Sequence, residues 1–187
     1  IDNICLIDIV CHGVPSPKVF EDYKLYLEKK FDSKIDKINF RYKNEESTQN
    51  IKVDFKNGKS YLSNRKDGDY FCRLFIEDII LRDSCYNCRY KSFERCGDIT
   101  LADFWGYENG VAKEFGDNKG VSLVLINTEK GLDMFEKIKA NIQYMEIEKK
   151  DCYEYNCFCN FKLPERYEYF WSEYLEIGFE SAISKFY

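Results

Sequence analysis

The residues of this chain best suited to chemistry are the cysteines between positions 84 and 97. Cys85 and Cys88 form a Cys-x-x-Cys pair, and Cys96 follows in the same segment. Thiolates at this spacing in a loop can share one metal ion or one iron–sulfur cluster, because a turn directs both sulfurs to the same side. A redox dithiol is an alternative, although such pairs usually stand at the start of a helix that follows a strand. Plain structural thiols are the third interpretation.

A complete metal centre needs ligands beyond the Cys-x-x-Cys pair. The ferredoxin run C-x2-C-x2-C-x3-C-P is absent from the sequence. Cys96 is near in sequence and Cys11 follows a predicted strand, so either could complete the site. Cys157 and Cys159 could instead join the pair in a four-cysteine zinc site, although their C-x-C spacing is less common there.

Three basic residues accompany the cysteines. Arg89, Lys91 and Arg95 lie in the same segment. Cationic side chains near thiols favour the ionised sulfurs, and they can hold the phosphate of an anionic cofactor. The alternative is an ordinary solvated loop.

Further polar candidates flank two predicted strands. His12 is the only histidine, but it cannot readily pair with Cys11 as a nucleophile, because adjacent residues point in different directions. Gly13 permits close backbone approach at this turn, so His12 and Gly13 suit cofactor contact or a turn. Asp98 and Asp103 bracket a short apolar strand. Their carboxylates suit three alternative roles: metal ligand, hydrogen-bond acceptor or loop cap.

Composition limits the functional classes. The chain has 187 residues, a net charge of −5 and a pI near 5.1, which argues against a nucleic-acid partner. It has no apolar run long enough for a membrane span and no signal peptide, and its nine cysteines are an odd number. We therefore expect a cytoplasmic protein with free thiols rather than a disulfide framework. Because the chain begins without Met inside an apolar segment, we also expect a piece of a larger protein.

Apolar periodicity predicts an alternation of strands and helices. Strands are expected at residues 4–10, 35–42, 51–55, 99–104, 121–126 and 142–147, with a hairpin turn at Asn57-Gly58. Helices are expected at residues 17–30, 70–81, 128–140 and from Pro164 onward, and residues 82–97 are expected to form a loop. The simplest account is an α/β (α+β) fold over residues 1–187, a single domain with a mixed sheet flanked by helices.

Several motifs occur in an order that resembles one known family. They are DIVCHGVPSP at 8–17, SCYNCRYK at 84–91, GDITLADFWG at 97–106, KGVSL at 119–123 and PER at 164–166. This order closely resembles the C-terminal domain of the coenzyme F420 hydrogenase/dehydrogenase beta-subunit family, over nearly the whole chain.

The resemblance implies flavin and iron–sulfur chemistry. Members pass electrons between a [4Fe-4S] cluster, FAD and a hydride-accepting substrate such as the deazaflavin F420. By resemblance, the cluster ligands are Cys11, Cys85 and Cys88, with Cys96 ranked lower. The segment 95–106, which includes Thr100, Trp105 and Gly106, is expected to line the flavin pocket.

The resemblance also implies partners. They are an N-terminal ferredoxin-like domain of the same protein, which this sequence lacks, a redox partner subunit and a small-molecule hydride acceptor. An isolated domain is expected to be able to lose its cofactors. A zinc-stabilised interaction domain without catalysis remains the alternative, as does a domain that has kept the fold and lost the chemistry. No catalytic residue is assigned.

Overall fold

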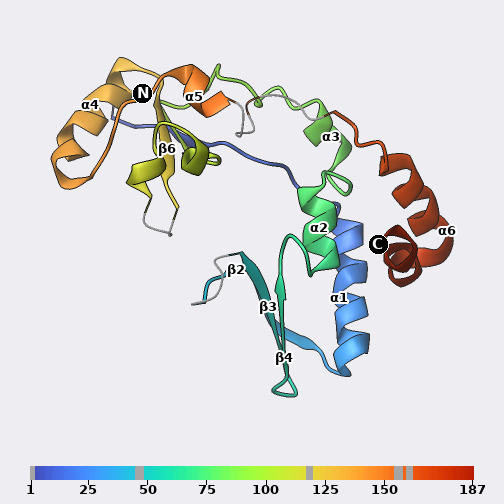
Figure 1. Cartoon of the computed structure of the whole chain (residues 1–187). Helices are drawn as coiled ribbons and strands as arrows, with labels where there is room; N and C mark the ends of the chain where they lie inside the picture. The colour runs from blue at the N-terminus through green and yellow to red at the C-terminus, as the bar shows by residue number, and fades with distance from the viewer. Residues whose placement is uncertain (1–2, 45–48, 117–119, 154–157, 159–161) are drawn as a thin grey trace. The chain divides into compact units, whose positions relative to one another are not determined.

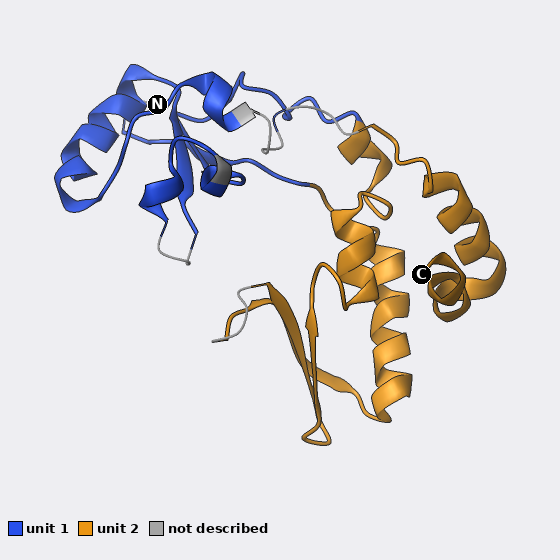
Figure 2. Cartoon of the chain, viewed as in Figure 1, with its two compact units in different colours: residues 1–12, 87–160 blue, residues 13–86, 161–187 orange. Residues whose placement is uncertain are grey.

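Strands and helices alternate along the chain, which confirms the mixed α/β fold class (Figure 1). The computed structural model describes residues 3–44, 49–116, 120–153, 158 and 162–187. The chain divides into two compact units (Figure 2). Unit 1 comprises residues 1–12 and 87–160, and unit 2 comprises residues 13–86 and 161–187. The single domain over residues 1–187 stays a prediction.

Unit 1 is built on a mixed sheet of three strands in the order β1-β5-β6. Its elements are β1 (Ile7–Ile9), β5 (Ile99–Asp103), the short helices η1 (Tyr107–Asn109) and η2 (Lys113–Phe115), β6 (Ser122–Ile126), α4 (Glu129–Ile138), η3 (Lys139–Asn141) and α5 (Lys149–Tyr153). Strand β1 runs parallel to β5, and β5 runs antiparallel to β6. The expected mixed sheet is therefore present.

Gly97 allows the start of β5 to approach β1 closely. A Cβ atom at this position would lie 3.0 Å from the Leu6 carbonyl oxygen and 3.1 Å from the Asp8 nitrogen. The Asp98 amide donates to the same Leu6 oxygen at 2.7 Å. A larger residue at position 97 would therefore push the two strands apart.

The two faces of this sheet differ in burial. Ala102, Leu123 and Leu125 point to one face, where they pack in the core of unit 1 with Phe104. On the other face Ile9, Leu101 and Val124 are neighbours in register and are 66%, 40% and 38% exposed. Strand β1 is therefore not the buried strand that its apolar sequence predicts.

Unit 2 combines an antiparallel sheet with helices. Its elements are α1 (Pro17–Phe31), β2 (Ile35–Tyr42), β3 (Asn50–Phe55), β4 (Ser60–Asn64), α2 (Tyr70–Ile76), α3 (Asp83–Tyr86) and α6 (Tyr167–Phe186). The Ser16 hydroxyl accepts a hydrogen bond from the Val19 amide at 3.4 Å and so caps α1, the helix expected at residues 17–30. The β3–β4 hairpin turns at Gly58, whose φ of 82° suits glycine.

The core of unit 2 brings α6 onto the first half of the chain. Phe170, Tyr174 and Phe179 of α6 are buried with Tyr23 of α1 and Phe71 of α2. The Tyr23 and Phe71 rings stack with centroids 5.0 Å apart. The aromatic residues of α6 therefore form a core face of unit 2.

Three predicted elements differ from the structure. Helix α2 ends at Ile76, because Asp78 takes a left-handed conformation with φ of 60°. The expected loop at 82–97 begins with the short helix α3. Residues 142–147 form no strand, because they make no ladder of backbone hydrogen bonds with the sheet.

Candidate functional site

Cys85 is a buried thiol that receives a backbone hydrogen bond. It lies in α3, and its sulfur is 3.3 Å from the Val14 amide nitrogen, which donates to it. The Val14 carbonyl in turn accepts from the Arg82 amide at 2.9 Å. The segment that follows Cys11-His12 is thus held against the first cysteine of the Cys-x-x-Cys pair. An N–H group directed at sulfur stabilises a thiolate.

Gly13 allows the Leu81 side chain to pack closely against the backbone at position 13. A Cβ atom there would lie 2.8 Å from a methyl carbon of Leu81. Pro15 and Leu81 also form an isolated antiparallel bridge. The glycine therefore leaves room for the Leu81 side chain beside this bridge.

Cys88 begins a turn in unit 1. Its carbonyl accepts from the Lys91 amide at 3.1 Å, and the Lys91 side chain is buried. The pKa of Arg89 is raised, first by its hydrogen bond with the Tyr90 hydroxyl and further by the charges of Cys96 and Cys88. The Arg89 guanidinium therefore carries its positive charge near both thiols.

Arg95 connects the segment 84–97, which carries Cys85, Cys88 and Cys96, to β1. One Nη atom lies 2.6 Å from the Tyr90 carbonyl oxygen, and the other lies 2.9 Å from that of Ile9. The same Nη atom is 3.2 Å from the Asp8 carboxylate, and the Arg95 side chain is only 5% exposed. The structure thus places Arg95 in a bridge between two backbone segments.

Asp98 and Thr100 lie in a polar network at the start of β5. The Asp98 carboxylate accepts from the Leu6 amide at 2.8 Å and from the Thr128 hydroxyl at 2.7 Å. These bonds, the Leu6 amide first, lower the pKa of Asp98. The Thr100 hydroxyl is fully buried and accepts from the Asn127 side chain at 2.9 Å. This network joins β1, β5 and the start of α4.

The remaining candidates lie at the surface of unit 1 or near it. Asp103 is exposed at the end of β5, and Trp105 is 47% exposed. Gly106 precedes η1 with φ of 82°. Cys11 and Cys96 are exposed, while His12 is half-buried.

The described residues contain no group of three or more His, Cys, Asp or Glu side chains arranged to hold a metal ion. Their cysteines are present as thiols, at Cys5, Cys11, Cys72, Cys85, Cys88, Cys96 and Cys152. Cys72 is buried in the core of unit 2. Cys157 and Cys159, named above for a zinc site, both lie outside the described residues.

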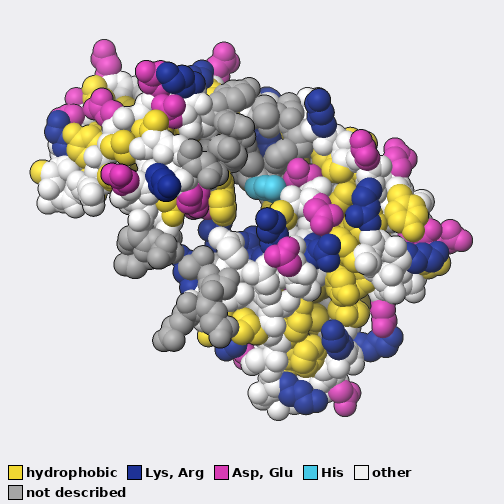
Figure 3. Space-filling view, in the orientation of Figure 1, with side chains coloured by type: hydrophobic (Ala, Val, Ile, Leu, Met, Phe, Trp, Pro, Cys, Tyr) yellow, Lys and Arg dark blue, Asp and Glu magenta, His cyan; other side chains and the backbone are white. Residues whose placement is uncertain are grey.

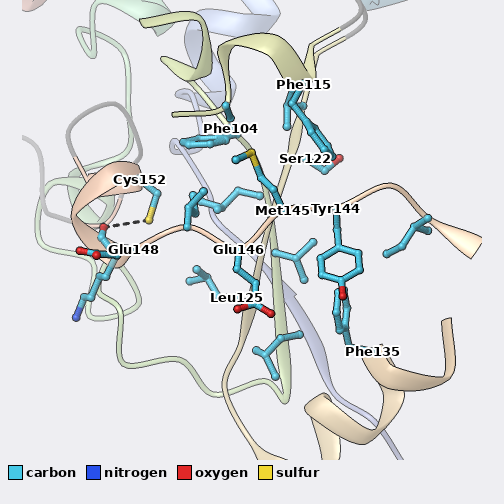
Figure 4. A pocket seen from close by; sticks show the side chains of 18 of the residues that line it. Phe104, Phe115, Ser122, Leu125, Phe135, Tyr144, Met145, Glu146, Glu148 and Cys152 are labelled. Atoms are coloured by element: carbon cyan, nitrogen blue, oxygen red, sulfur yellow. Dashed lines mark hydrogen bonds between the residues drawn. The ribbon is translucent and has the colours of Figure 1, made fainter. Parts of the chain in front are cut away.

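A cavity of about 950 Å³ lies within unit 1 (Figure 4). Its walls are β6, α4 and the segment 142–149, with aromatic side chains from Phe93, Phe104 and Phe115. Of the segment 95–106, which the resemblance implies for the flavin pocket, Phe104 alone lines it, and none of the individually named candidates that the structure describes does so. Sequence reasoning missed this cavity because its lining residues, taken singly, resemble ordinary core positions.

Surface charge agrees with the composition. On the face shown in Figure 3, Lys and Arg side chains are interspersed with Asp and Glu rather than joined in a continuous basic surface. In the described part of the chain, no helix has the length and apolar character that a membrane crossing requires.

Comparison with known families identifies the one to which these motifs belong. The model of the C terminus of the coenzyme F420 hydrogenase/dehydrogenase beta subunit matches residues 2–151. The chain belongs to this family. The match covers both the segment around Cys11 and the Cys-x-x-Cys segment, so it confirms the resemblance drawn from the motifs. It also connects the chain with redox function. No curated protein matches the sequence.

Proposed function

We propose that the chain is the redox domain of a flavin- and iron–sulfur-dependent oxidoreductase, or of an electron-transfer subunit of one. The family match over residues 2–151 carries this proposal. When bound, FAD exchanges a hydride and a [4Fe-4S] cluster exchanges single electrons, so together they connect two-electron and one-electron chemistry. The chain's own residues supply ligands, orientation and charge.

The thiols proposed as cluster ligands are Cys11, Cys85 and Cys88, with Cys96 as a further candidate. Two observations support a thiolate centre. The Val14 amide donates to the Cys85 sulfur, and hydrogen bonds to sulfur are one of the ways in which a protein sets a cluster's potential. The Arg89 guanidinium lies near Cys88 and Cys96.

The proposed flavin-contacting residues fall into two groups. His12, Lys91, Asp103, Trp105 and Gly106 are proposed to contact the cofactor. Gly13, Arg95, Asp98 and Thr100 are proposed to shape its surroundings, because each makes a contact that fixes the backbone near those residues. The proposed partners are a ferredoxin-like N-terminal domain, a redox subunit and a small-molecule hydride acceptor, and the proposed compartment is the cytoplasm.

Cofactor analysis of the full-length protein, purified without oxygen, tests this proposal. We expect bound flavin together with iron and acid-labile sulfide. Cys85→Ser and Cys88→Ser should each lose most of the iron, while Cys5→Ser, a matched change at a half-buried thiol that is no candidate ligand, should keep it. Stoichiometric zinc in a colourless protein would reject the proposal and favour a zinc-stabilised interaction domain. Iron unchanged in both variants would reject Cys85 and Cys88 as ligands.

A further inference from the structure

The cavity of unit 1 has an open strand edge as one wall. Strand β6 is the last strand of the sheet, and each residue from Gly120 to Asn127 lines the cavity. Side chains on both faces of one strand can line the same cavity only if the strand meets it edge-on. The open edge of β6 therefore borders the cavity.

The register fixes which backbone groups stand on that edge. The Phe104 amide donates to the Val121 carbonyl, and the Asn127 amide donates to the Asp98 carbonyl. In an antiparallel pair such bonded positions alternate, so Val121, Leu123 and Leu125 face β5. The N–H and C=O groups of Ser122, Val124 and Ile126 then point away from β5, and no backbone partner for them is found among the described residues.

The other walls are apolar and rich in rings. Phe104 follows β5 directly, Phe93 comes from the segment after the Cys-x-x-Cys pair, and Phe135 of α4 meets Tyr144 edge-on with centroids 5.2 Å apart. Figure 4 shows Met145 on the opposite side of its segment from Tyr144, toward Phe104. Aromatic walls of this kind favour a flat ligand, because offset and edge-to-face ring contacts add to the apolar area that is buried.

The charges of the lining disfavour anionic ligands. The lining includes three carboxylates, from Glu136, Glu146 and Glu148, and an ammonium group, from Lys149. That ammonium group lies 4.2 Å from the centre of the Phe93 ring. Among the described residues, no arginine lines the cavity. Phosphate sites in proteins are built from Arg, Lys or converging backbone N–H groups, and a phosphate beside these carboxylates would be repelled.

We propose that this cavity binds a flat aromatic molecule that is neutral or cationic and carries no phosphate or carboxylate. The aromatic side chains stack on the faces of this molecule. The backbone N–H and C=O groups of Ser122, Val124 and Ile126 form hydrogen bonds with acceptors and donors along one edge of the molecule. Phe104 belongs to the segment 95–106 that the resemblance implies for the flavin pocket, but no residue proposed individually as an FAD contact or cluster ligand lines this cavity.

Two fluorescent probes that differ in charge test the proposal on the full chain. 1-N-phenylnaphthylamine is neutral, and 8-anilinonaphthalene-1-sulfonate adds a sulfonate to a closely similar ring system. We expect one neutral probe per chain and at least tenfold weaker binding of the anionic probe, a difference of about 1.4 kcal/mol. A loosely packed core would bind both probes alike, so equal affinities, or no binding of the neutral probe, would overturn the proposal.

Paired variants locate the site. Val124→Trp should fill the cavity and weaken the neutral probe about tenfold or more. Leu101→Trp is the control, because Leu101 is the in-register neighbour of Val124, is similarly exposed and does not line the cavity. Glu146→Lys should strengthen the anionic probe, whereas Glu108→Lys, an exposed change in unit 1 outside the lining, should not. Equal behaviour within either pair would place the bound probe elsewhere and overturn the proposal.

Discussion

The Arg95 guanidinium and the Asp8 carboxylate form an ion pair at 3.2 Å, with the arginine side chain almost fully buried. The pair joins residues far apart in the sequence, namely the strand that leads to Cys11 and the segment that follows Cys88. The same guanidinium also binds the carbonyls of Ile9 and Tyr90. The local geometry of the cysteine segment in unit 1 therefore depends on one side chain.

Replacing Arg95 should destabilise the fold. Arg95→Gln removes the charge that pairs with Asp8 and leaves backbone carbonyls unpaired, so we expect a loss of about 2–4 kcal/mol in the free energy of unfolding. Urea denaturation measures this loss. Arg89→Gln, an exposed arginine in the same segment, should cost less than about 1 kcal/mol. Equal losses in the two variants would contradict the bridging role of Arg95.

Asp69 is a buried carboxylate that accepts hydrogen bonds from three donors. It accepts from the Tyr23 and Tyr61 hydroxyls at 2.8 and 3.1 Å and, as the cap of α2, from the Cys72 amide at 2.8 Å. Asp69→Ala leaves these groups unpaired in the core, so the free energy of unfolding should fall by about 2–4 kcal/mol. Asp67→Ala, an exposed neighbour, should change it by less than about 0.5 kcal/mol in the same denaturation experiment.

The cysteines should differ in reactivity. Burial first, and then the charge of Asp69, raise the pKa of Cys72, and burial raises that of Cys152. Because the thiolate is the reactive form, both should alkylate slowly with iodoacetamide in the folded, metal-free chain. The exposed Cys11 and Cys96 should react first, as peptide mass spectrometry would record. Fast labelling of Cys72 in folded protein would contradict its core placement.

Asp98 should make stability depend on acid pH. Its pKa lies below the ordinary value because the Leu6 amide and the Thr128 hydroxyl bond to the ionised form. The folded chain therefore holds the proton less tightly than the unfolded chain, so ionised Asp98 stabilises the fold above about pH 4. This contribution is lost as the pH falls through the lowered pKa. The difference in unfolding free energy between the wild type and Asp98→Asn should shrink over that range, and a constant difference would contradict the assignment.

Gly97 should tolerate no side chain. In Gly97→Ala the added Cβ would meet backbone atoms of both Leu6 and Asp8 at about 3 Å. Backbone on both sides cannot move without parting the strands, so we expect a loss of about 1–3 kcal/mol. Gly110→Ala is the matched control, because the nearest atom to its Cβ would be the Gly106 oxygen at 3.9 Å. Thermal unfolding of both variants distinguishes the two positions.

The sequence predicts where helices and turns lie better than it predicts which of their residues are buried. Ser16-Pro17 marks the start of α1 and Asn57-Gly58 marks the hairpin, because capping and turn preferences act over a few residues. Burial is set by distant packing, so the apolar run of β1 gives no sign that Ile7 and Ile9 are exposed. The apolar residues 142–147 likewise fit a strand, but they lie across a cavity from the edge that a strand would join.

In the candidate site, too, the sequence identifies the residues but not their partners. Residue type and spacing single out Cys85 and Cys88, but not the Val14 amide that donates to the Cys85 sulfur, since backbone groups carry no sequence signal. Arg95, Asp98 and Thr100 stand out as polar residues in a motif, and only the structure shows that their partners are chain segments of unit 1. The cavity has no sequence signature, because its walls come from three separate segments.

The core of unit 2 has a consequence for the order in which the chain acquires its structure. Helix α6, at the end of the chain, supplies Phe170, Phe179 and Ile183 to a core that begins with Val19 and Tyr23 of α1. During synthesis, the apolar face of α1 is covered only after the residues of α6 have been translated. A recombinant piece cut to residues 2–151, the span of the family match, would keep that face exposed, so we expect it to aggregate where the full chain stays in solution.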